Sequence, residues 1–313
     1  MKVLFVSRGN LEYLIKYEGN IGHLENQQAE SLVNVGIDIE HFIINGKGII
    51  GHLRNVGRLR KFIKENKFDL IHAHFIWSGI VASLAITNLP IVVSLKGSDV
   101  HKNRIRRLLI FIFQKLSWRS VIVKSTKMMK LLAITTNVYI IPNGINLNQF
   151  KYIDKKLARE KLGVNDKKHI IFIADPKRKE KNYQLAEKAL ELLNNDIVEL
   201  NIVSNVKHKL IPYYLSAADV LLLTSEYEGS PNVIKEAMAC NCPIVSVDVG
   251  DVSEVIQDTD GCFITSNDPK EISINIEKAL VFGKNTNGRE HILHLDSLVT
   301  AKKIKTIYES IIA

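Results

Sequence analysis

Short apolar segments alternate with amphipathic segments along the chain, and this alternation restricts the folds that the chain can adopt. In the first half, the apolar segments predict strands and several of the segments between them predict helices. The predicted strands are residues 3–6, 40–44, 70–74, 91–95, 121–123 and 138–141, and the predicted helices are 27–34, 57–66 and 81–86. Strands buried on both faces are continuously apolar, so the pattern favours a parallel sheet covered by helices on each side.

The second half repeats this pattern after a polar, linker-like stretch at 151–168. Its alternating segments are residues 170–174, 183–193, 198–203, 210–216, 220–224, 244–247, 252–256, 263–264 and 272–282. The chain ends in a predicted basic amphipathic helix at 297–312, and its 313 residues suit two domains of about 150 residues each. We therefore expect domains at 1–150 and 151–296, then a terminal helix at 297–313. Ligands are expected at the carboxyl ends of the strands.

One segment after a predicted strand carries the strongest functional signal. It runs from Glu228 through Ser230, Pro231 and Asn232 to Glu236, and it is predicted to be a loop followed by a helix. Ser230 is expected to cap that helix, with Pro231 at its first position and Glu236 at its sixth. A helix amino terminus attracts phosphate, and two carboxylates beside it are acceptors for sugar hydroxyls. The segment therefore predicts a ligand that carries both phosphate and sugar.

The spacing of Glu228 and Glu236, with the Ala-Met-Ala and Pro-Ile-Val segments that follow, resembles the signature of the family 4 retaining glycosyltransferases. The alternative is a solvated surface helix with two unrelated acids. The resemblance implies the α/β fold called GT-B, in which two Rossmann-like α/β/α domains face each other across a cleft and a C-terminal helix crosses back to the first domain. It also implies that Glu236 binds the ribose of a nucleotide sugar and that Glu228 lies beside the donor sugar.

A cationic loop at 175–181 leads from the first predicted strand of the second half to the next helix. Cations in such a loop suit a diphosphate leaving group. Lys181 matches the lysine that the family usually shows there. The family's arginine position falls on Pro176, so that Arg178 or Lys177 would have to serve instead. The alternative is a solvated charged loop. The resemblance thus implies catalytic roles for Arg178, Lys181 and Glu228, and donor contacts for the helix start at 230–232.

Two positions in the first half are expected to contact the donor. Gly19 aligns with the first glycine of a loop through which the family's backbone approaches phosphate and acceptor, although a plain turn is an equal alternative. Lys96 takes the place of a histidine that touches the donor sugar in many members, and a lysine supplies a charge or a hydrogen-bond donor in place of imidazole. His72 and His74 are expected on opposite faces of one strand, as core histidines.

Basic residues concentrate in one part of the chain. The formal net charge is +9, and residues 100–153 contain ten Lys and Arg residues but no acidic residue. Such an excess indicates a polyanionic partner. Cations and an apolar run combine at 102–115, so the 102–130 region predicts peripheral contact with an anionic membrane, the alternative being a buried helix over 108–113. Nucleic acid is not expected as a partner, because no stacking platform or known reading motif accompanies the charge.

The cysteines and apolar runs indicate where the protein works. Its three cysteines, Cys240, Cys242 and Cys262, form no disulfide or zinc pattern, which favours a reducing cytoplasm. No apolar run approaches the roughly 18 residues that span a bilayer. The first apolar segment is predicted to be a strand and not a signal peptide. We expect a cytoplasmic protein that works at the inner face of the cytoplasmic membrane, with no metal and no cofactor.

The resemblance implies an enzyme that moves a sugar from a UDP- or GDP-linked donor to a lipid-linked or polysaccharide acceptor in cell-surface glycan synthesis. Retention of the anomeric configuration is expected. Two alternatives remain at this point: a nucleotide-sugar epimerase or hydrolase on the same fold, and a non-catalytic GT-B partner subunit. The substituted Lys96 and the shifted Arg178 keep the second alternative open.

Overall fold

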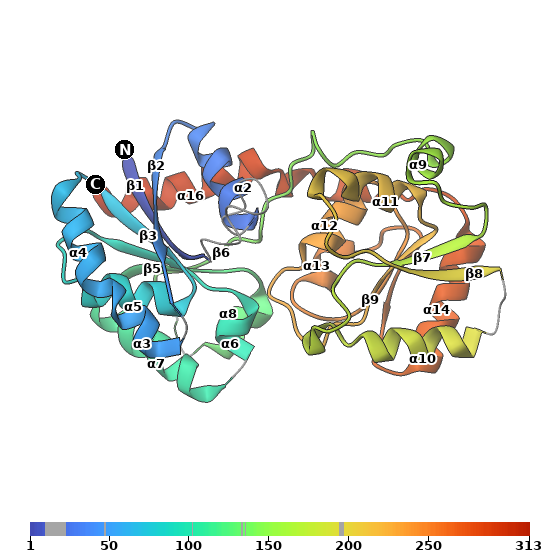
Figure 1. Ribbon diagram of the computed structural model, residues 1–313, viewed down its shortest axis with the longest axis horizontal. Coiled ribbons are helices and arrows are strands. Elements are labelled where there is room, and N and C mark those ends of the chain that lie inside the picture. Colours follow the sequence, from blue (N-terminus) through green and yellow to red (C-terminus); the bar gives the residue numbers. More distant parts are fainter. Residues whose placement is uncertain (10–22, 47, 102, 133, 135, 194–196) are drawn as a thin grey trace. The chain divides into compact units, whose positions relative to one another are not determined.

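The computed structural model describes residues 1–9, 23–46, 48–101, 103–132, 134, 136–193 and 197–313. These residues form two compact units, each built around one parallel β-sheet (Figure 1). The first unit comprises residues 1–144 and 297–313, and the second comprises residues 145–296. Parallel sheets with helices on both faces confirm the predicted α/β class.

The first unit contains a six-stranded sheet in the order β2-β1-β3-β4-β5-β6, with every neighbouring pair parallel. Its strands are β1 Lys2–Arg8, β2 Asp38–Ile44, β3 Leu70–His74, β4 Ile91–Ser94, β5 Trp118–Val123 and β6 Val138–Ile140. Each strand predicted in this half overlaps one of them. The central strands β3 and β4 are buried along their whole length, which explains why their sequences do not alternate between apolar and polar residues.

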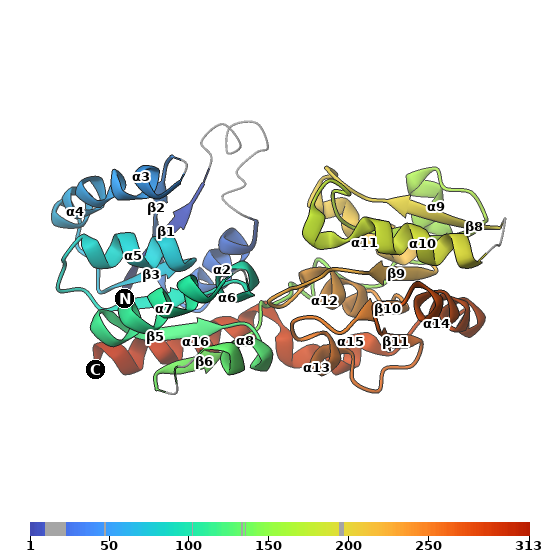
Figure 2. The ribbon, with the colours of Figure 1, turned by 90° about the horizontal axis from the view of Figure 1, so that it is seen from below.

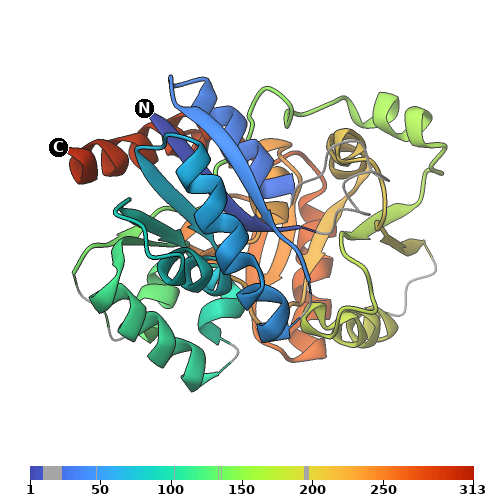
Figure 3. The same ribbon diagram turned by 60° about the vertical axis from the view of Figure 1, so that its left-hand side comes forward.

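Helices cover both faces of this sheet. They are α2 His23–Val33, α3 Gly48–Leu53, α4 Asn55–Glu65, α5 Ile76–Leu84, α6 Gly97–His101, α7 Arg104–Leu116, α8 Thr126–Leu131 and α16 Ser297–Ile312. One face packs against α4, α5 and α7, where Leu59 and Ile110 join the core. The other packs against α2 and α16 through Leu32 and Tyr308. Accordingly, α16 lies on the opposite side of this sheet from α3 and α4 (Figure 2), which are the blue helices in the foreground of Figure 3.

One helix prediction in the first unit needs correction. The segment 81–86 is not a separate helix but the end of α5, which begins at Ile76. Because α5 is apolar on nearly all sides, its sequence lacks the periodicity that reveals a helix. The short helices α3, α6 and α8 were not predicted. The terminal helix, by contrast, has the bounds predicted from the sequence.

The second unit contains a five-stranded parallel sheet in the order β11-β10-β9-β7-β8. Its strands are β7 Lys168–Phe172, β8 Val198–Ile202, β9 Val220–Leu223, β10 Ile244–Val247 and β11 Cys262–Thr265. Its α-helices are α9 Lys155–Leu162, α10 Tyr183–Leu193, α11 Ile211–Ala217, α12 Asn232–Ala239, α13 Val252–Ile256, α14 Pro269–Phe282 and α15 Gly288–His291. Three 3₁₀ turns complete it: η1 Lys179–Lys181, η2 His208–Leu210 and η3 Leu293–Leu295.

The second sheet is also covered on both faces. Helices α11, α12 and α13 share one core with β9, through residues such as Leu215, Ile234 and Leu221. Helices α10 and α14 share the other core, through residues such as Ala186 and Ile276. In neither unit does the described chain contain a helix that is both long and apolar enough to cross a membrane.

A buried histidine joins the terminal helix to the first sheet. His72 in β3 hydrogen-bonds to the Tyr308 hydroxyl of α16 and to Ser94 Oγ of β4, the latter at 2.8 Å. The rings of His72 and His74 stack with centroids 4.4 Å apart, so the prediction that they lie on opposite faces is wrong. Residues two apart in a strand share a face. Both are core residues as predicted, and burial lowers the pKa of His72 to about 3.

Replacing His72 by asparagine should change how stability depends on pH. Unfolded histidine binds a proton near pH 6.5, whereas folded His72 stays neutral down to about pH 3. The unfolded state therefore binds more protons in this range, and His72 lowers the unfolding free energy as the pH falls. Relative to the wild type, His72→Asn should gain about 3 kcal/mol between pH 7 and pH 4. Urea unfolding at fixed pH measures this, and a difference independent of pH would contradict the prediction.

Candidate functional site

The predicted phosphate-and-sugar segment lies at the carboxyl end of β9, but its helix begins differently from the prediction. The N-cap of α12 is Pro231, its first residue is Asn232, and Glu236 is its fifth. Ser230 is therefore not the capping residue that the sequence suggested. The Ser230 hydroxyl donates instead to Asp251 Oδ2 at 2.7 Å and accepts a hydrogen bond from Lys235 Nζ.

These contacts belong to a buried polar cluster beneath the start of α12. Lys235 is 1% exposed, and its Nζ lies 3.3 Å from Asp251 Oδ2. Burial lowers the pKa of Lys235, while Asp251 counteracts this. Gly250, which precedes Asp251, has φ +58°. A Cβ atom at this position would lie only 2.9 Å from the carbonyl oxygen of Gly229. The cluster and this close backbone approach fix the loop that carries Glu228. Sequence reasoning did not identify the ion pair, because Lys235 lies within α12 whereas Asp251 is the N-cap of α13.

Glu236 is held by a histidine from another element of the second unit. The Glu236 side chain is 7% exposed, and its Oε1 lies 3.0 Å from His208 Nε2. Gln149 Nε2 lies 3.1 Å from His208 Nδ1, and Phe150 packs edge-on against the same ring. With Gln149 donating to Nδ1, the neutral imidazole carries its proton on Nε2 and donates it to the carboxylate. His208 thus orients Glu236, and sequence reasoning did not identify it.

The structure brings Lys181 and Glu228 together. Lys181 Nζ lies 2.5 Å from Glu228 Oε1, and the two side chains are 13% and 18% exposed. The loop after β7 that carries Lys181 is fixed to the end of β9, because the Thr224 hydroxyl donates to the carbonyls of Lys181 and Asn182. The pair therefore sits at the carboxyl ends of two adjacent strands, β7 and β9. A cation beside this carboxylate also reduces its repulsion of a phosphate ligand.

Arg178 belongs to the same loop but has a different partner. Its Nε and Nη2 donate to Glu180 Oε1 at 3.0 and 2.7 Å, and its side chain is 55% exposed. The hydrogen bond from Arg178 lowers the pKa of Glu180. The structure therefore does not place Arg178 with Lys181 and Glu228 as a second cation. Any contact with a bound diphosphate requires Arg178 to leave Glu180.

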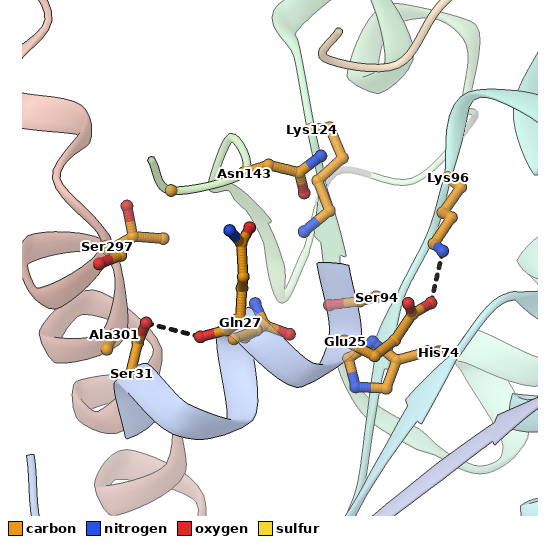
Figure 4. Close-up of a pocket in the computed structure, with 13 residues that line it drawn as sticks. Glu25, Gln27, Ser31, His74, Ser94, Lys96, Lys124, Asn143, Ser297 and Ala301 are labelled. Carbon is orange, nitrogen blue, oxygen red and sulfur yellow. Dashed lines mark hydrogen bonds and ion pairs between the residues drawn. The ribbon is translucent and has the colours of Figure 1, made fainter. Parts of the chain in front are cut away.

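In the first unit, Lys96 is paired with a carboxylate that sequence reasoning missed. Its ammonium forms an ion pair with Glu25 of α2 (Figure 4). The same ammonium lies 3.9 Å from the centroid of the Phe75 ring. Glu25 is 4% exposed. A fixed cation therefore occupies the position where many members of the family that the chain resembles carry histidine. Gly19, the other predicted donor contact of this half, lies outside the described residues.

The pocket beside Lys96 is small. It has a volume of about 40 Å³ and is lined by Glu25, His74, Ser94 and Lys96, among others (Figure 4). Within the described structure, Glu25 Oε2 and His74 Nε2 have no hydrogen-bond partner. A buried water needs about 10–15 Å³ of such space. The pocket suits a few waters that satisfy these atoms, and it is too small for a sugar.

The basic region contains a helix with an exposed apolar stripe. In α7, the side chains of Ile105, Leu108 and Leu116 are 69%, 57% and 79% exposed, and Ile110 is buried in the core of the first unit. The alternative of a buried helix over 108–113 is therefore wrong for Leu108. Asn103 caps α7 by accepting a hydrogen bond from the Arg106 amide.

No group of three or more His, Cys, Asp or Glu side chains that could hold a metal ion occurs among the residues described by the structure. The three cysteines are free thiols, and burial raises the pKa of both Cys242 and Cys262 to about 12. They are therefore protonated and poor nucleophiles near neutral pH.

Two protein-family models match most of the chain. The model described as "Glycosyltransferase Family 4" matches residues 14–149, and the model described as "Glycosyl transferases group 1" matches residues 178–289. The second range contains Lys181, Glu228 and Glu236. It also contains the buried cluster around Lys235.

Proteins with similar sequences have glycosyltransferase names. The putative teichuronic acid biosynthesis glycosyltransferase TuaC of Bacillus subtilis is 25% identical over 233 residues, covering 65% of this chain and 60% of that protein. The UDP-Gal:alpha-D-GlcNAc-diphosphoundecaprenol alpha-1,3-galactosyltransferase of Escherichia coli is 25% identical over 264 residues, covering 70% and 68%. The matched part of the chain thus spans less than two thirds of the first relative.

A solved structure shares the fold. Alr3699/HepE of Anabaena, in complex with UDP and glucose, superimposes with a TM-score of 0.74 at 19% sequence identity. The superposition covers 99% of this chain and 100% of that chain. At this identity the likeness establishes the fold alone.

Proposed function

Since the chain belongs to the family 4 glycosyltransferases of the GT-B fold, we propose that it transfers a sugar from a nucleotide diphosphate to an acceptor hydroxyl with retention of the anomeric configuration. One observation carries this proposal: Lys181 and Glu228 form a close pair at the carboxyl ends of β7 and β9. Lys181 follows β7, and Glu228 lies on the loop that leads from β9 into α12, the helix of Glu236. Ligands of open α/β sheets bind at this edge.

Each residue of this site has a proposed role. Glu236, oriented by His208, accepts hydrogen bonds from the ribose hydroxyls. Glu228 lies on the sugar side, and Lys181 binds the diphosphate. The amino terminus of α12, with Asn232 as its first residue, adds partial positive charge.

The proposed reaction separates charge, and the site must stabilise it. The bond from the sugar C1 to the diphosphate oxygen breaks, and a new bond from C1 to the acceptor oxygen forms on the same face. The acceptor proton passes to the departing phosphate oxygen. Negative charge builds up on the diphosphate during this step, so a cation already fixed beside it lowers the barrier. Lys181 is that cation.

The names of the relatives support a narrower choice of substrates. A uridine nucleotide is the donor that we favour over a guanosine nucleotide, because the Escherichia coli relative is named for UDP-Gal. The same name includes a diphosphoundecaprenol acceptor, and the Bacillus relative is named for teichuronic acid synthesis. We therefore propose a lipid-linked acceptor and a role in cell-surface polysaccharide assembly.

Contact with the membrane is a further part of the proposal. The exposed apolar residues of α7 lie in a sequence region without acidic residues, so this helix can insert apolar side chains while neighbouring cations meet anionic lipid. Reduced cysteines are consistent with the cytoplasmic face of that membrane.

A thermal-shift panel of uridine and guanosine diphosphate sugars tests the donor assignment. A ligand at one hundred times its Kd stabilises the folded state by about 2.7 kcal/mol, which is expected to raise Tm by roughly 5 °C. We expect such a rise with uridine diphosphate sugars and little change with guanosine diphosphate sugars. The same rise with guanosine compounds would overturn the choice of base. No rise with any of these donors would contradict the proposed function itself.

A further inference from the structure

The first unit contains a larger cavity that the proposed donor site does not use. It lies at the carboxyl ends of β1, β3 and β4, and its walls come from α3, from α6 and from the starts of α5 and α7. Its volume is about 400 Å³, ten times that of the pocket beside Lys96. Cavities that bind small molecules measure roughly 300 to 1,000 Å³, so this one is large enough for a ligand.

Hydrogen-bond donors line the polar side of this cavity. Arg8 ends β1, and its side chain has no hydrogen-bond or ion-pair partner among the residues that the structure describes. Arg106 donates one N–H to the carbonyl of Ser98 at 2.9 Å, which leaves most of its guanidinium donors for a ligand. Ser78 is 1% exposed, and its hydroxyl has no partner in the described structure. Two guanidinium groups and a buried hydroxyl together favour a phosphate.

One acidic group also faces the cavity. Asp99 is 2% exposed, and its Oδ2 accepts the backbone N–H of Lys96 at 3.0 Å. Burial raises its pKa to about 6. The other titratable lining residue, His52, uses Nδ1 to bond the carbonyl of Gly48. Even when Asp99 is ionised, Arg8 and Arg106 give the lining of the cavity a positive net charge.

Exposed apolar side chains occur on two of the helices that line the cavity, α3 and α7. Ile49 of α3 lines it and is 58% exposed, and Ile50 and Leu53 of the same helix are 68% and 46% exposed. On α7, Arg106 lines the cavity, while Ile105 and Leu108 are exposed. An anion-binding interior whose lining helices also carry exposed apolar residues matches an amphiphile, because the headgroup meets cations and the chain covers apolar surface.

The wall between this cavity and Lys96 is a strained residue. Phe75 follows β3 with φ +75° and ψ 154°, a conformation that non-glycine residues rarely adopt. The Lys96 ammonium lies over the face of the Phe75 ring, and Phe75 also lines the cavity. Strain of this kind persists where the surrounding structure enforces it and is concentrated at functional sites.

We propose that this cavity binds the phosphate of a lipid-linked acceptor between Arg8 and Arg106, with the hydrocarbon chain lying along the exposed residues of α3 and α7. This inference rests on the proposed transfer to a lipid-linked acceptor. It assigns the acceptor to residues of the first unit alone, with the phosphate inside the cavity and the chain at its rim. The occupant is a lipid phosphate, and free phosphate is an outcome of the test.

The binding of three probes to the purified full chain tests the proposal. Farnesyl phosphate carries both parts of the predicted ligand, farnesol has only the chain, and inorganic phosphate has only the anion. Titration calorimetry should give the tightest binding with farnesyl phosphate, at least tenfold tighter than with either of the others. Equal binding of farnesol would overturn the role of the arginines. Equal binding of inorganic phosphate would overturn the lipid assignment.

Variants locate the binding site. Arg8→Gln and Arg106→Gln should each weaken farnesyl phosphate binding at least tenfold. The control is Arg119→Gln, which removes an exposed cation of the basic region outside the cavity. Its affinity for farnesyl phosphate should stay within twofold of the wild type. Ile49→Ser should also weaken binding while leaving that of inorganic phosphate unchanged. Wild-type affinity in both arginine variants would refute the site.

The donor thermal shift is measured on the same preparations to separate the two proposals. Arg8→Gln and Arg106→Gln should keep the wild-type shift with donor, which also shows that the variants are folded. If donor binding is intact but no variant alters lipid binding, this inference alone is wrong. If donors never stabilise the chain, the proposed function is wrong.

Discussion

Replacing Lys181 by alanine should lower the kcat of sugar transfer by roughly a thousandfold. Removing one preorganised donor from a site of developing negative charge typically costs about 10²–10³ in kcat, and Lys181 is the cation that the structure fixes beside Glu228. Steady-state kinetics with saturating donor and acceptor measures the effect. The matched control is Lys179→Ala, which removes an exposed cation from the same loop and should stay within threefold of the wild type.

The ion pair itself must be separated from the catalytic effect. In Lys181→Ala the carboxylate of Glu228 loses its cation and repels the diphosphate, so the Kd for the donor should rise together with the loss of kcat. Adding Glu228→Gln removes that repulsion. The double variant should therefore recover most of the donor affinity but none of the turnover. Recovery of turnover would mean that Lys181 only neutralises Glu228 and takes no part in transfer.

Replacing Arg178 should have a smaller effect than replacing Lys181. Its guanidinium is half exposed and already bonded to Glu180, so it is not preorganised for the diphosphate. The structure thus ranks two residues to which the resemblance gave the same role. This ranking comes from their partners, since both lie in one cationic loop of the sequence.

Replacing Glu236 by alanine should weaken nucleotide binding by at least about a hundredfold, because two hydrogen bonds from ribose hydroxyls to a carboxylate are lost at about 1.5–3 kcal/mol each. Calorimetric titration with uridine diphosphate measures the loss. Glu254→Ala on α13 is the control, since it removes an exposed carboxylate of the same unit and should not change the Kd. An unchanged Kd in Glu236→Ala would show that the ribose contact is misassigned.

A second nucleotide identifies the part of the ligand that Glu236 recognises. The wild type should bind 2′,3′-dideoxyuridine diphosphate far more weakly than uridine diphosphate, whereas Glu236→Ala should bind the two alike. Loss of discrimination assigns the contact to the ribose hydroxyls. If the variant still discriminates, the loss of affinity comes from disturbing His208 and the start of α12, and not from a missing ribose contact.

Regular structure was predictable where a short stretch of sequence determines it. The buried strands read as apolar runs, and α16 has the 3.6-residue periodicity and the bounds that the sequence indicates. Local sequence signals failed where a residue distant in the sequence determines the contacts of a side chain. Ser230 had the side chain of a helix cap, but Asp251, 21 positions away, takes its hydroxyl.

The same reason explains the missed members of the candidate site. His208 belongs to η2 and lies 28 positions from Glu236. Glu25 lies 71 positions from Lys96, its ion-pair partner. Separations of this kind leave no mark on a single sequence. The structure nevertheless explains how a lysine fits where many members of the family carry histidine. The Lys96 ammonium pairs with Glu25 and lies over the Phe75 ring.

Measuring the release of nucleotide diphosphate with and without acceptor tests whether the chain transfers sugar. The chain is incubated with the donor that stabilises it, in the presence or absence of a phosphate-bearing lipid glycan, and both free nucleotide and sugar attached to lipid are measured. We expect that release requires the acceptor and equals the sugar gained by the lipid, and that Lys181→Ala lowers both roughly a thousandfold. Release at the same rate without acceptor would indicate a hydrolase. Donor binding without any turnover would indicate a non-catalytic subunit. Either result would contradict the proposed transfer reaction.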